Sequence, residues 1–387
     1  MRKTLLATTA LAAATGMAAI ASPASAAERL SLGVHGYFQA YFGYLEADND
    51  DNRRNVDFFR EAEIHFRGEV ALDNGMKVGI DVQLEAETCG DQIDESYLYF
   101  QGDFGKLVLG SENSAAYLMS YGAPAADANF DGADPNYSPY GVGFAYAPNM
   151  TSDSEKITYF TPRFAGFGFG VSWTPDNTED QNGATLPAFD NNNPGLGNTQ
   201  NGIQENIWEF GLNYENKFGD FGVLAGMTYG FAMDTESDNY LITAGLPARV
   251  GIVAGAPGIL PAVPAVTAPA DEQEQFSAGL NLTFAGFTVG GGYLWDNQGL
   301  AGSNSREVFA AGLAWANGPL RLGASLAMQY DDSPADNDVD RYTIGAQYVY
   351  APGMQLRATG IYYDTQTGNP NDIDDAIVAV VGTVITF

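Results

Sequence analysis

The stretch VDFFREAEIHFRGEVAL, Val56 to Leu72, decides the fold because its side chains alternate in character with a period of two. The even positions, such as Phe58 and Ile64, are mostly apolar, while the odd positions carry most of the charges. Apolar residues do not recur at the three- and four-residue spacing of a helix, so this stretch is predicted to be a β-strand. One face of the strand suits an apolar environment and the other suits water.

A tight turn and a second alternating strand follow directly. The turn is DNGM, Asp73 to Met76, and its Asn-Gly pair is typical of a hairpin. The returning strand alternates apolar residues from Val78 to Ala86 with polar ones from Gly79 to Glu87. Both strands exceed ten residues and place carboxylates on one face, which suits strands that cross a bilayer between lipid and water.

The same unit of strand, glycine-containing turn and returning strand recurs along the chain. Seven short turns begin at Asp73, Gly102, Ala165, Gly219, Ala285, Asn317 and Ala351. Eight longer segments alternate with them, near 46–54, 88–92, 112–154, 174–205, 233–274, 296–305, 331–340 and 364–375. This alternation predicts an all-β fold, a 16-stranded antiparallel transmembrane β-barrel with short periplasmic turns and long external loops.

The two ends of the chain are expected to close this barrel. The first strand begins near Leu30, and the last runs from about Asp375 to Phe387. An even number of strands lets these two pair, so that no sheet edge is left in lipid. The alternation of the last strand is blurred, because valines such as Val378 and Val380 also occupy its other face.

Residues 1–26 have the pattern of a secretory signal peptide. Arg2 and Lys3 precede an apolar run that ends in the small-residue site Ala24-Ser25-Ala26. Cleavage after Ala26 would leave one barrel domain, 27–387, with 15 Lys+Arg against 48 Asp+Glu and a net charge of −33. Such a charge disfavours nucleic acid as a partner and favours cations.

Neither catalysis nor a defined metal site is predicted. His35 and His65 are the only histidines, and no G-x-S-x-G, H-E-x-x-H or C-x-x-C motif accompanies them. Asp48 and Asp50 have the spacing of a calcium loop, but Arg53 stands where an EF-hand needs glycine. Loose calcium binding by these loop acids stays open beside a solvated acidic loop, and no other cofactor is expected.

The segment Val250 to Ala270 is uncharged and long enough to span a membrane as a helix. Its four prolines, however, remove hydrogen-bond donors and break helical geometry. It is therefore expected to be an extended apolar loop over the mouth of the barrel or against a neighbouring subunit.

The chain resembles the trimeric general diffusion porins of Gram-negative bacteria, most closely those of alphaproteobacteria. The resemblance covers essentially the whole chain after the leader, and its most specific segments are DESYLYFQGDFGKLVLGSENSAAYLM and KITYFTPRFAGFGFGVSWTPD. It implies a homotrimer in the bacterial outer membrane, in contact with outer-membrane lipid and lipopolysaccharide. It also implies that the third loop, here about 112–149, folds into the lumen as a constriction.

The resemblance assigns roles to charged residues on this loop and on the barrel wall. The loop acids are Glu112, Asp127, Asp131 and Asp134, and the basic residues expected to face them are His65 and Arg67. The pore wall is expected to comprise Glu61, Glu63, His65, Arg67, Glu69, Asp81, Glu85 and Glu87. So many like charges on one face are typical of a water-filled channel, whereas glycosidase chemistry needs only one acid and one nucleophile.

The expected function is passive diffusion of small hydrophilic solutes and ions, with a preference for cations because few basic residues balance the acids. The protein is not expected to be an enzyme. A substrate-selective channel for a sugar or another small nutrient is the alternative.

Overall fold

The computed structural model describes residues 29–47, 54–86, 93–137, 145–177, 189–190, 193–194, 204–235, 239–243, 249–253, 256–260, 266–333, 337–367 and 375–387. The predicted signal peptide, 1–26, lies outside these residues, as do the candidate calcium ligands Asp48 and Asp50 and the wall candidate Glu87.

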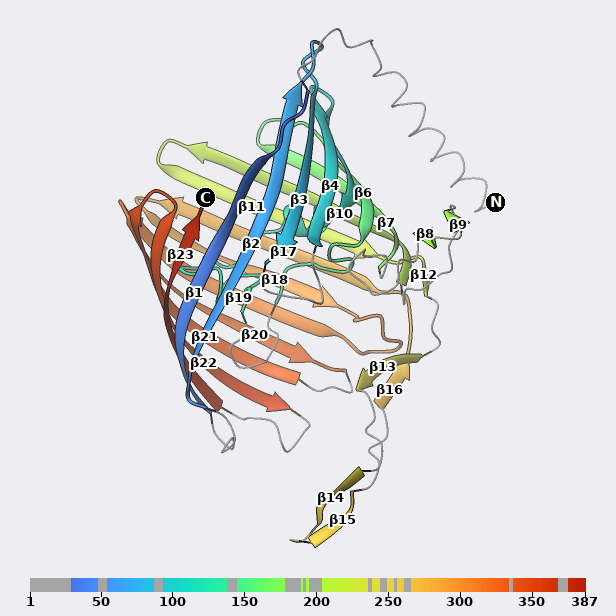
Figure 1. Cartoon of the computed structure of the whole chain (residues 1–387), viewed down its shortest axis with the longest axis vertical. Coiled ribbons are helices and arrows are strands. Elements are labelled where there is room, and N and C mark those ends of the chain that lie inside the picture. The colour runs from blue at the N-terminus through green and yellow to red at the C-terminus, as the bar shows by residue number, and fades with distance from the viewer. Residues whose placement is uncertain are drawn as a thin grey trace.

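Sixteen antiparallel strands form a closed barrel (Figure 1), which confirms the predicted fold class. In order around the wall they are β1 (Gly33–Ala47), β2 (Val56–Ala71), β3 (Lys77–Glu85), β4 (Ile93–Gly102), β5 (Gly105–Ser111), β6 (Glu155–Phe160), β7 (Phe167–Asp176), β10 (Gln204–Phe218), β11 (Phe221–Phe231), β17 (Glu274–Phe284), β18 (Phe287–Asp296), β19 (Arg306–Asn317), β20 (Leu320–Asp331), β21 (Asn337–Ala351), β22 (Met354–Thr367) and β23 (Asp375–Thr386). A short extra strand, β12 (Asp234–Thr235), pairs with β10. The barrel closes where β1 pairs with β23, from Tyr37 opposite Thr386 to Ala47 opposite Ala376.

The period-two pattern of the sequence becomes the two faces of the wall. On β2, Phe58 is 61% exposed on the outside, whereas Glu63 and His65 are each 8% exposed on the inside. The register continues this separation into β1, where Tyr37 lies opposite Glu63 and Phe38 lies opposite Ala62. Because adjacent strands keep the same parity, each face stays uniform across the hairpin.

The seven short turns lie where the sequence places them, each joining consecutive strands of the wall. In the turn between β2 and β3, Gly75 adopts a φ of 81°, a conformation that glycine allows without strain, and the Asn74 side chain accepts a hydrogen bond from the Met76 amide. Exposed aromatic residues flank these turns on the outer face, among them Phe164, Phe167, Phe218, Phe284 and Phe287. Such a band is typical of the membrane–water boundary of a barrel.

The blurred alternation of β23 has a packing reason. Ile377 and Val381 are exposed on the outer face, while Val378 and Val380 are buried on the inner face. The inner valines belong to an apolar cluster that includes Phe130 from the connection between β5 and β6. β23 is therefore apolar on both sides because part of its inner face is covered by protein instead of water.

Two small hairpins belong to the connection between β11 and β17 and extend away from the barrel (Figure 1). One pairs β13 (Asn239–Thr243) with β16 (Val266–Pro269), and the other pairs β14 (Arg249–Val253) with β15 (Ala256–Leu260). The described parts of the proline-rich segment 250–270 are thus extended, as expected. Among the described residues, no helix has the length and apolar character needed to cross a membrane. A further two-residue pair, β8 (Phe189–Asp190) and β9 (Asn193–Pro194), lies between β7 and β10.

Candidate pore constriction

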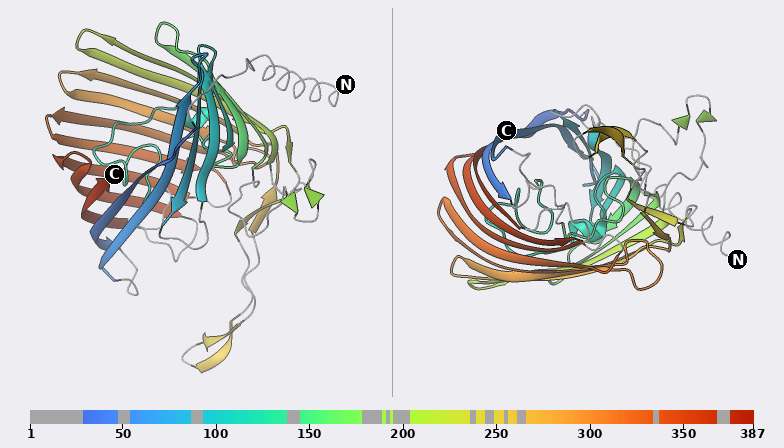
Figure 2. Two further views of the ribbon diagram at one scale, coloured as in Figure 1. Left: turned by 45° about the horizontal axis from the view of Figure 1, so that its top comes forward. Right: turned by 90° about the horizontal axis from the view of Figure 1, so that it is seen from below.

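The described parts of the connection between β5 and β6, residues 112–137 and 145–154, fold back into the barrel, as the third loop was expected to do. Figure 2 (right) shows this segment inside the ring of strands. It begins with one helical turn, α2 (Ala115–Leu118), for which the Ser114 side chain accepts a hydrogen bond from the Tyr117 amide at 3.3 Å. From α2 the loop follows the inner wall toward β22 and returns to β6. We call residues 112–154 the inner loop.

The base of the inner loop is anchored on a buried carboxylate of β10. Ser114 Oγ donates a hydrogen bond to Glu209 Oε1 at 2.8 Å, and Thr151 Oγ1 donates to Glu209 Oε2 at 2.6 Å. The two hydroxyls come from the two ends of the loop, so a single side chain of the wall holds both ends. The Ala115 amide also donates to Ser172 Oγ of β7 at 2.8 Å.

The far end of the inner loop is fixed by two buried ion pairs. Arg357 Nη1 of β22 lies 2.7 Å from Asp127 Oδ1, and Thr359 donates to the other oxygen of the same carboxylate at 3.1 Å. Arg341 Nη2 of β21 lies 3.4 Å from Asp131 Oδ1, which also accepts a hydrogen bond from Ser325 at 2.6 Å. Two of the four expected loop acids are therefore neutralised against the wall.

The other two loop acids lie in different surroundings. Glu112 is buried at the start of the inner loop, where its carboxylate accepts a hydrogen bond from the Asn113 amide and its backbone carbonyl accepts one from Lys156. Asp134 is exposed and accepts a hydrogen bond from the Tyr117 hydroxyl at 2.7 Å. Burial and the neighbouring Asp134 charge raise the pKa of Tyr117, so this hydroxyl remains a neutral donor. Asp134 is the loop acid most open to solvent.

Carboxylates gather on the wall formed by β1, β2 and β3. Oxygen atoms of Glu61, Glu63 and Glu85 all lie within 4.8 Å of one another, close enough to bind a shared cation. Tyr37 donates hydrogen bonds to Glu61 at 3.0 Å and to Glu63 at 2.6 Å, and Gln39 donates to Glu61. Tyr37 and Gln39 are neutral, so they orient Glu61 and Glu63 without cancelling the charge of these carboxylates.

The expected basic wall residues face their own neighbours instead of the loop acids. His65 Nε2 lies 2.8 Å from Glu63, and Arg67 lies within hydrogen-bond distance of His65 Nδ1 and of Asp81. Farther toward the periplasmic turn, Glu69 pairs with Lys77 at 2.9 Å. Glu61, Glu63, His65, Arg67 and Asp81 are thus linked along the wall through Tyr37. Gln39 donates to Glu61 and accepts from Asn129, so it joins this network to the inner loop.

Arg341 and Arg357 are the site residues that the sequence reasoning missed. They lie more than two hundred residues beyond the acids they bind, so no local spacing connects them. A signal was present in the strand parity, because each arginine shares the inner face of its strand with residues such as Thr343 and Thr359. Basic wall residues do face loop acids, as expected in general. They are Arg341 of β21 and Arg357 of β22, however, and not His65 and Arg67.

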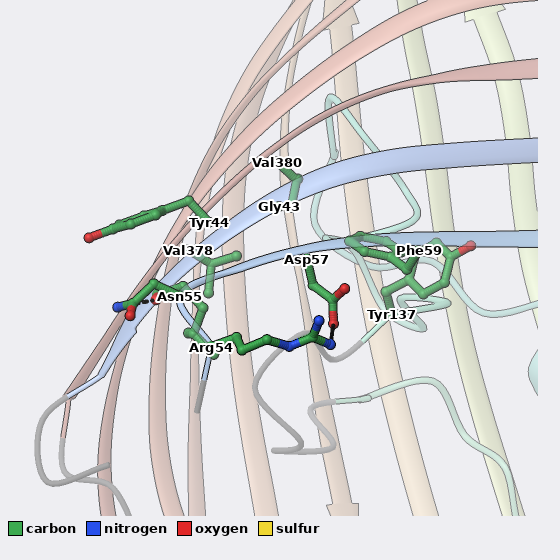
Figure 3. Close-up of a pocket in the computed structure, with 10 residues that line it drawn as sticks. Gly43, Tyr44, Arg54, Asn55, Asp57, Phe59, Tyr137, Val378 and Val380 are labelled. Carbon is green, nitrogen blue, oxygen red and sulfur yellow. Dashed lines mark hydrogen bonds and ion pairs between the residues drawn. The ribbon is translucent and has the colours of Figure 1, made fainter. Parts of the chain in front are cut away.

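Aromatic side chains pack the tip of the inner loop against the barrel wall. Phe130 and Tyr137 pack against Tyr41 of β1 and Phe59 of β2, with ring centroids 4.9 to 5.9 Å apart. Beside it lies a hollow of about 470 Å³, lined by Phe59, Tyr137 and the exposed ion pair of Arg54 and Asp57, whose Nη2 and Oδ2 atoms are 3.1 Å apart. Figure 3 shows how these side chains lie.

A closed transmembrane barrel with a loop anchored inside its lumen defines a membrane channel. A family model described as Gram-negative porin matches residues 7–368. The chain belongs to this family, and its location is the outer membrane.

Solved structures agree with this assignment at the level of the fold. A loop L8 deletion mutant of OmpT from Vibrio cholerae is 15% identical over 93% of this chain and 100% of that chain, with a TM-score of 0.61. An anion-selective porin from Comamonas acidovorans is 14% identical over 93% of this chain and 100% of its own, with a TM-score of 0.58. A mutant of the Rh. blastica porin is 15% identical over 92% and 100%, with a TM-score of 0.52. No curated protein sequence matches the chain.

Proposed function

We propose that this porin is a cation-preferring channel through which small hydrophilic solutes and ions diffuse passively. The observation that carries the proposal is that two sets of carboxylates have different partners. Asp127 and Asp131 are paired with arginines beneath the inner loop, whereas Glu61 and Glu63 accept hydrogen bonds from the neutral side chains of Tyr37 and Gln39 and lie within 4.8 Å of Glu85. Carboxylates that line a water-filled passage attract cations and repel anions.

The selectivity must come from the chain's own residues, because an anion-selective porin shares the same fold. The net charge of −31 supports the same sign of selectivity. The wall triad also suits transient occupancy by a divalent cation, and the loop acids Asp48 and Asp50 suit loose calcium binding. The proposed function needs no cofactor and no enzymatic activity.

The proposed mature protein is a homotrimer of residues 27–387, formed after removal of the signal peptide 1–26 and embedded among outer-membrane lipid and lipopolysaccharide. A trimer is supported by the similar fold of OmpT from Vibrio cholerae, whose structure is described as a trimer form. The exposed aromatic residues beside the short turns suit the lipid boundary of such an assembly.

Recording in planar bilayers under a salt gradient tests the proposal. We expect stepwise conductance in groups of three and a reversal potential whose sign shows faster passage of cations. A reversal potential of the opposite sign would refute the cation preference, and an absence of conductance would refute the channel itself.

A substrate-selective channel is the second candidate, and the hollow in Figure 3 favours it. Its aromatic wall, Phe59 and Tyr137, lies beside the charged and polar side chains of Arg54 and Asp57, an arrangement that suits a small solute with both apolar and polar faces. Saturable reduction of the ion current by a sugar, lost in Phe59→Ala, would support selective uptake. Currents independent of added sugar would favour general diffusion.

A further inference from the structure

The inner loop lies on a part of the wall that is lined by glycine. Five consecutive strands, β7, β10, β11, β17 and β18, place Gly170, Gly211, Gly226, Gly279 and Gly292 under the loop. A Cβ atom on Gly211 would lie 2.6 Å from the carbonyl oxygen of Ala115 in the loop. On Gly226 it would lie 2.8 Å from the carbonyl oxygen of Met119, and on Gly279 it would overlap the carbonyl oxygen of Tyr121.

The next three strands continue the same arrangement. A Cβ atom on Gly312 of β19 would lie 2.8 Å from the carbonyl oxygen of Pro124, and one on Gly323 of β20 would lie 2.9 Å from the backbone nitrogen of Ala126. On Gly345 of β21 it would lie 3.0 Å from the Ala126 methyl group. We call these eight glycines, one on each of eight neighbouring strands, the glycine track.

The members of the glycine track are direct partners at four of the seven steps between neighbouring strands and are offset by two residues at the other three. Gly170 is paired with Gly211, Gly226 with Gly279, Gly279 with Gly292, and Gly323 with Gly345. The loop residues that meet them run in the same order, from Ala115 over β7 and β10 to Ala126 over β20 and β21. Because the order matches, the loop from Ala115 to Ala126, which begins with the helical turn α2, lies across all eight strands.

At Gly211, Gly226, Gly279 and Gly312 the nearest atom is a carbonyl oxygen of the loop backbone, which cannot move away by changing a side-chain rotamer. Glycine is the residue that permits such close approach of two backbones. Two wall side chains then secure the stretch by donating to loop carbonyls, Asn281 to Gly122 at 3.0 Å and Arg321 to Ala125 at 2.8 Å.

We propose that the glycine track determines the width of the pore and therefore its size limit for solutes. The inference rests on the proposed channel function and names the residues that set its size selectivity. By removing side chains from the wall, the track lets the inner loop lie flat and keeps the space beside the carboxylates of β1 to β3 open. A methyl group on the track would push the loop backbone into that space, because closely packed groups cannot share the volume.

The main experiment compares two substitutions on the inner face of one strand. Gly226→Ala places a methyl group against Met119 and Tyr121 of the loop, whereas Gly222→Ala on the same strand places it 3.4 Å from Thr283 in ordinary contact. We expect Gly226→Ala to lose roughly half or more of the single-channel conductance and to exclude smaller sugars in liposome swelling. Gly222→Ala should match the wild type, and both should keep the wild-type reversal potential.

A rescue experiment separates a shift of the loop from damage to the barrel. Gly345→Ala introduces a methyl group opposite that of Ala126, and the double variant Gly345→Ala/Ala126→Gly moves the methyl group from the loop to the wall. We expect reduced conductance in the single variant and wild-type conductance in the double variant. Heat-dependent mobility of the trimer in SDS gels verifies that each barrel is folded.

The outcomes distinguish the two proposals. If the wild type does not conduct, the channel function fails. If the wild type conducts and folded Gly226→Ala has the conductance and sugar limit of the wild type, the glycine track does not set the pore width. If the double variant has the same reduced conductance as Gly345→Ala, the proposal about the glycine track is also refuted, because removing the contact with the Ala126 methyl group would then have no effect.

Discussion

The two sides of the inner wall are made of the same kind of strand yet present opposite surfaces. From β7 to β21 the wall supplies glycines, followed by the two arginines that bind the inner loop. From β1 to β3 it supplies long polar side chains, among them Tyr37, Glu61 and Glu63. The difference shows that the composition of the strands distinguishes the part of the wall that supports residues 115–126 of the loop from the part that carries the carboxylates.

The largest effect should follow from breaking the attachment of the loop on its supporting side. Arg341 is 1% exposed, and Arg341→Ala would leave the buried Asp131 carboxylate without its cationic partner. Loss of one partner of a buried pair costs about 3–5 kcal/mol, so we expect the tip of the inner loop to detach. Noisy conductance in bilayers and new protease cleavage within the loop would reveal the detachment.

Arg54→Ala is the matched control, because Arg54 also pairs with an aspartate but its side chain is 79% exposed. Exposed pairs contribute little to stability, so this variant should keep a quiet channel and a protected loop. Equal noise and equal cleavage in the two variants would show that the buried pair is not what fixes the loop.

A second, smaller effect is expected on the water-facing side. Changing Glu61, Glu63 and Glu85 together to Gln preserves their shape while removing three negative charges from the wall. The reversal potential should move clearly toward that of a non-selective pore, since the focused negative potential is lost. Conductance should change less than selectivity. An unchanged reversal potential would assign the cation preference to other residues.

The smallest effect is expected for Asp134→Asn, which tests whether an exposed acid of the loop contributes less to selectivity than the wall carboxylates. Asp134 is exposed, and its hydrogen bond from Tyr117 can be retained by the amide oxygen of Asn. We expect a slight loss of cation preference at low salt that disappears at high salt, because screening weakens an exposed charge. A shift as large as that of the triple wall variant would contradict the division between loop and wall.

The strand count and the turns could be predicted from the sequence because each depends on local patterns, whereas the entry of the third loop into the lumen was implied by the resemblance to the porin family. Alternation marked the strands, and turns such as DNGM at Asp73 marked their reversals. The partners of Asp127 and Asp131 could not be found in this way, since Arg357 and Arg341 come close only after the barrel closes. The valines on the inner face of β23 were a visible sign of contact with the loop, but the sequence did not show what covers them.

The seam between β1 and β23 has a consequence for the order of folding. The Phe387 amide donates to the Gly36 carbonyl, and the Gly36 amide donates to the Phe387 carbonyl, both at 3.0 Å. Phe387 is thus bonded to a residue near the start of β1, a pairing between residues very far apart in the sequence. Contacts between remote residues form slowly, so the exported chain must be kept from aggregating until β23 pairs with β1.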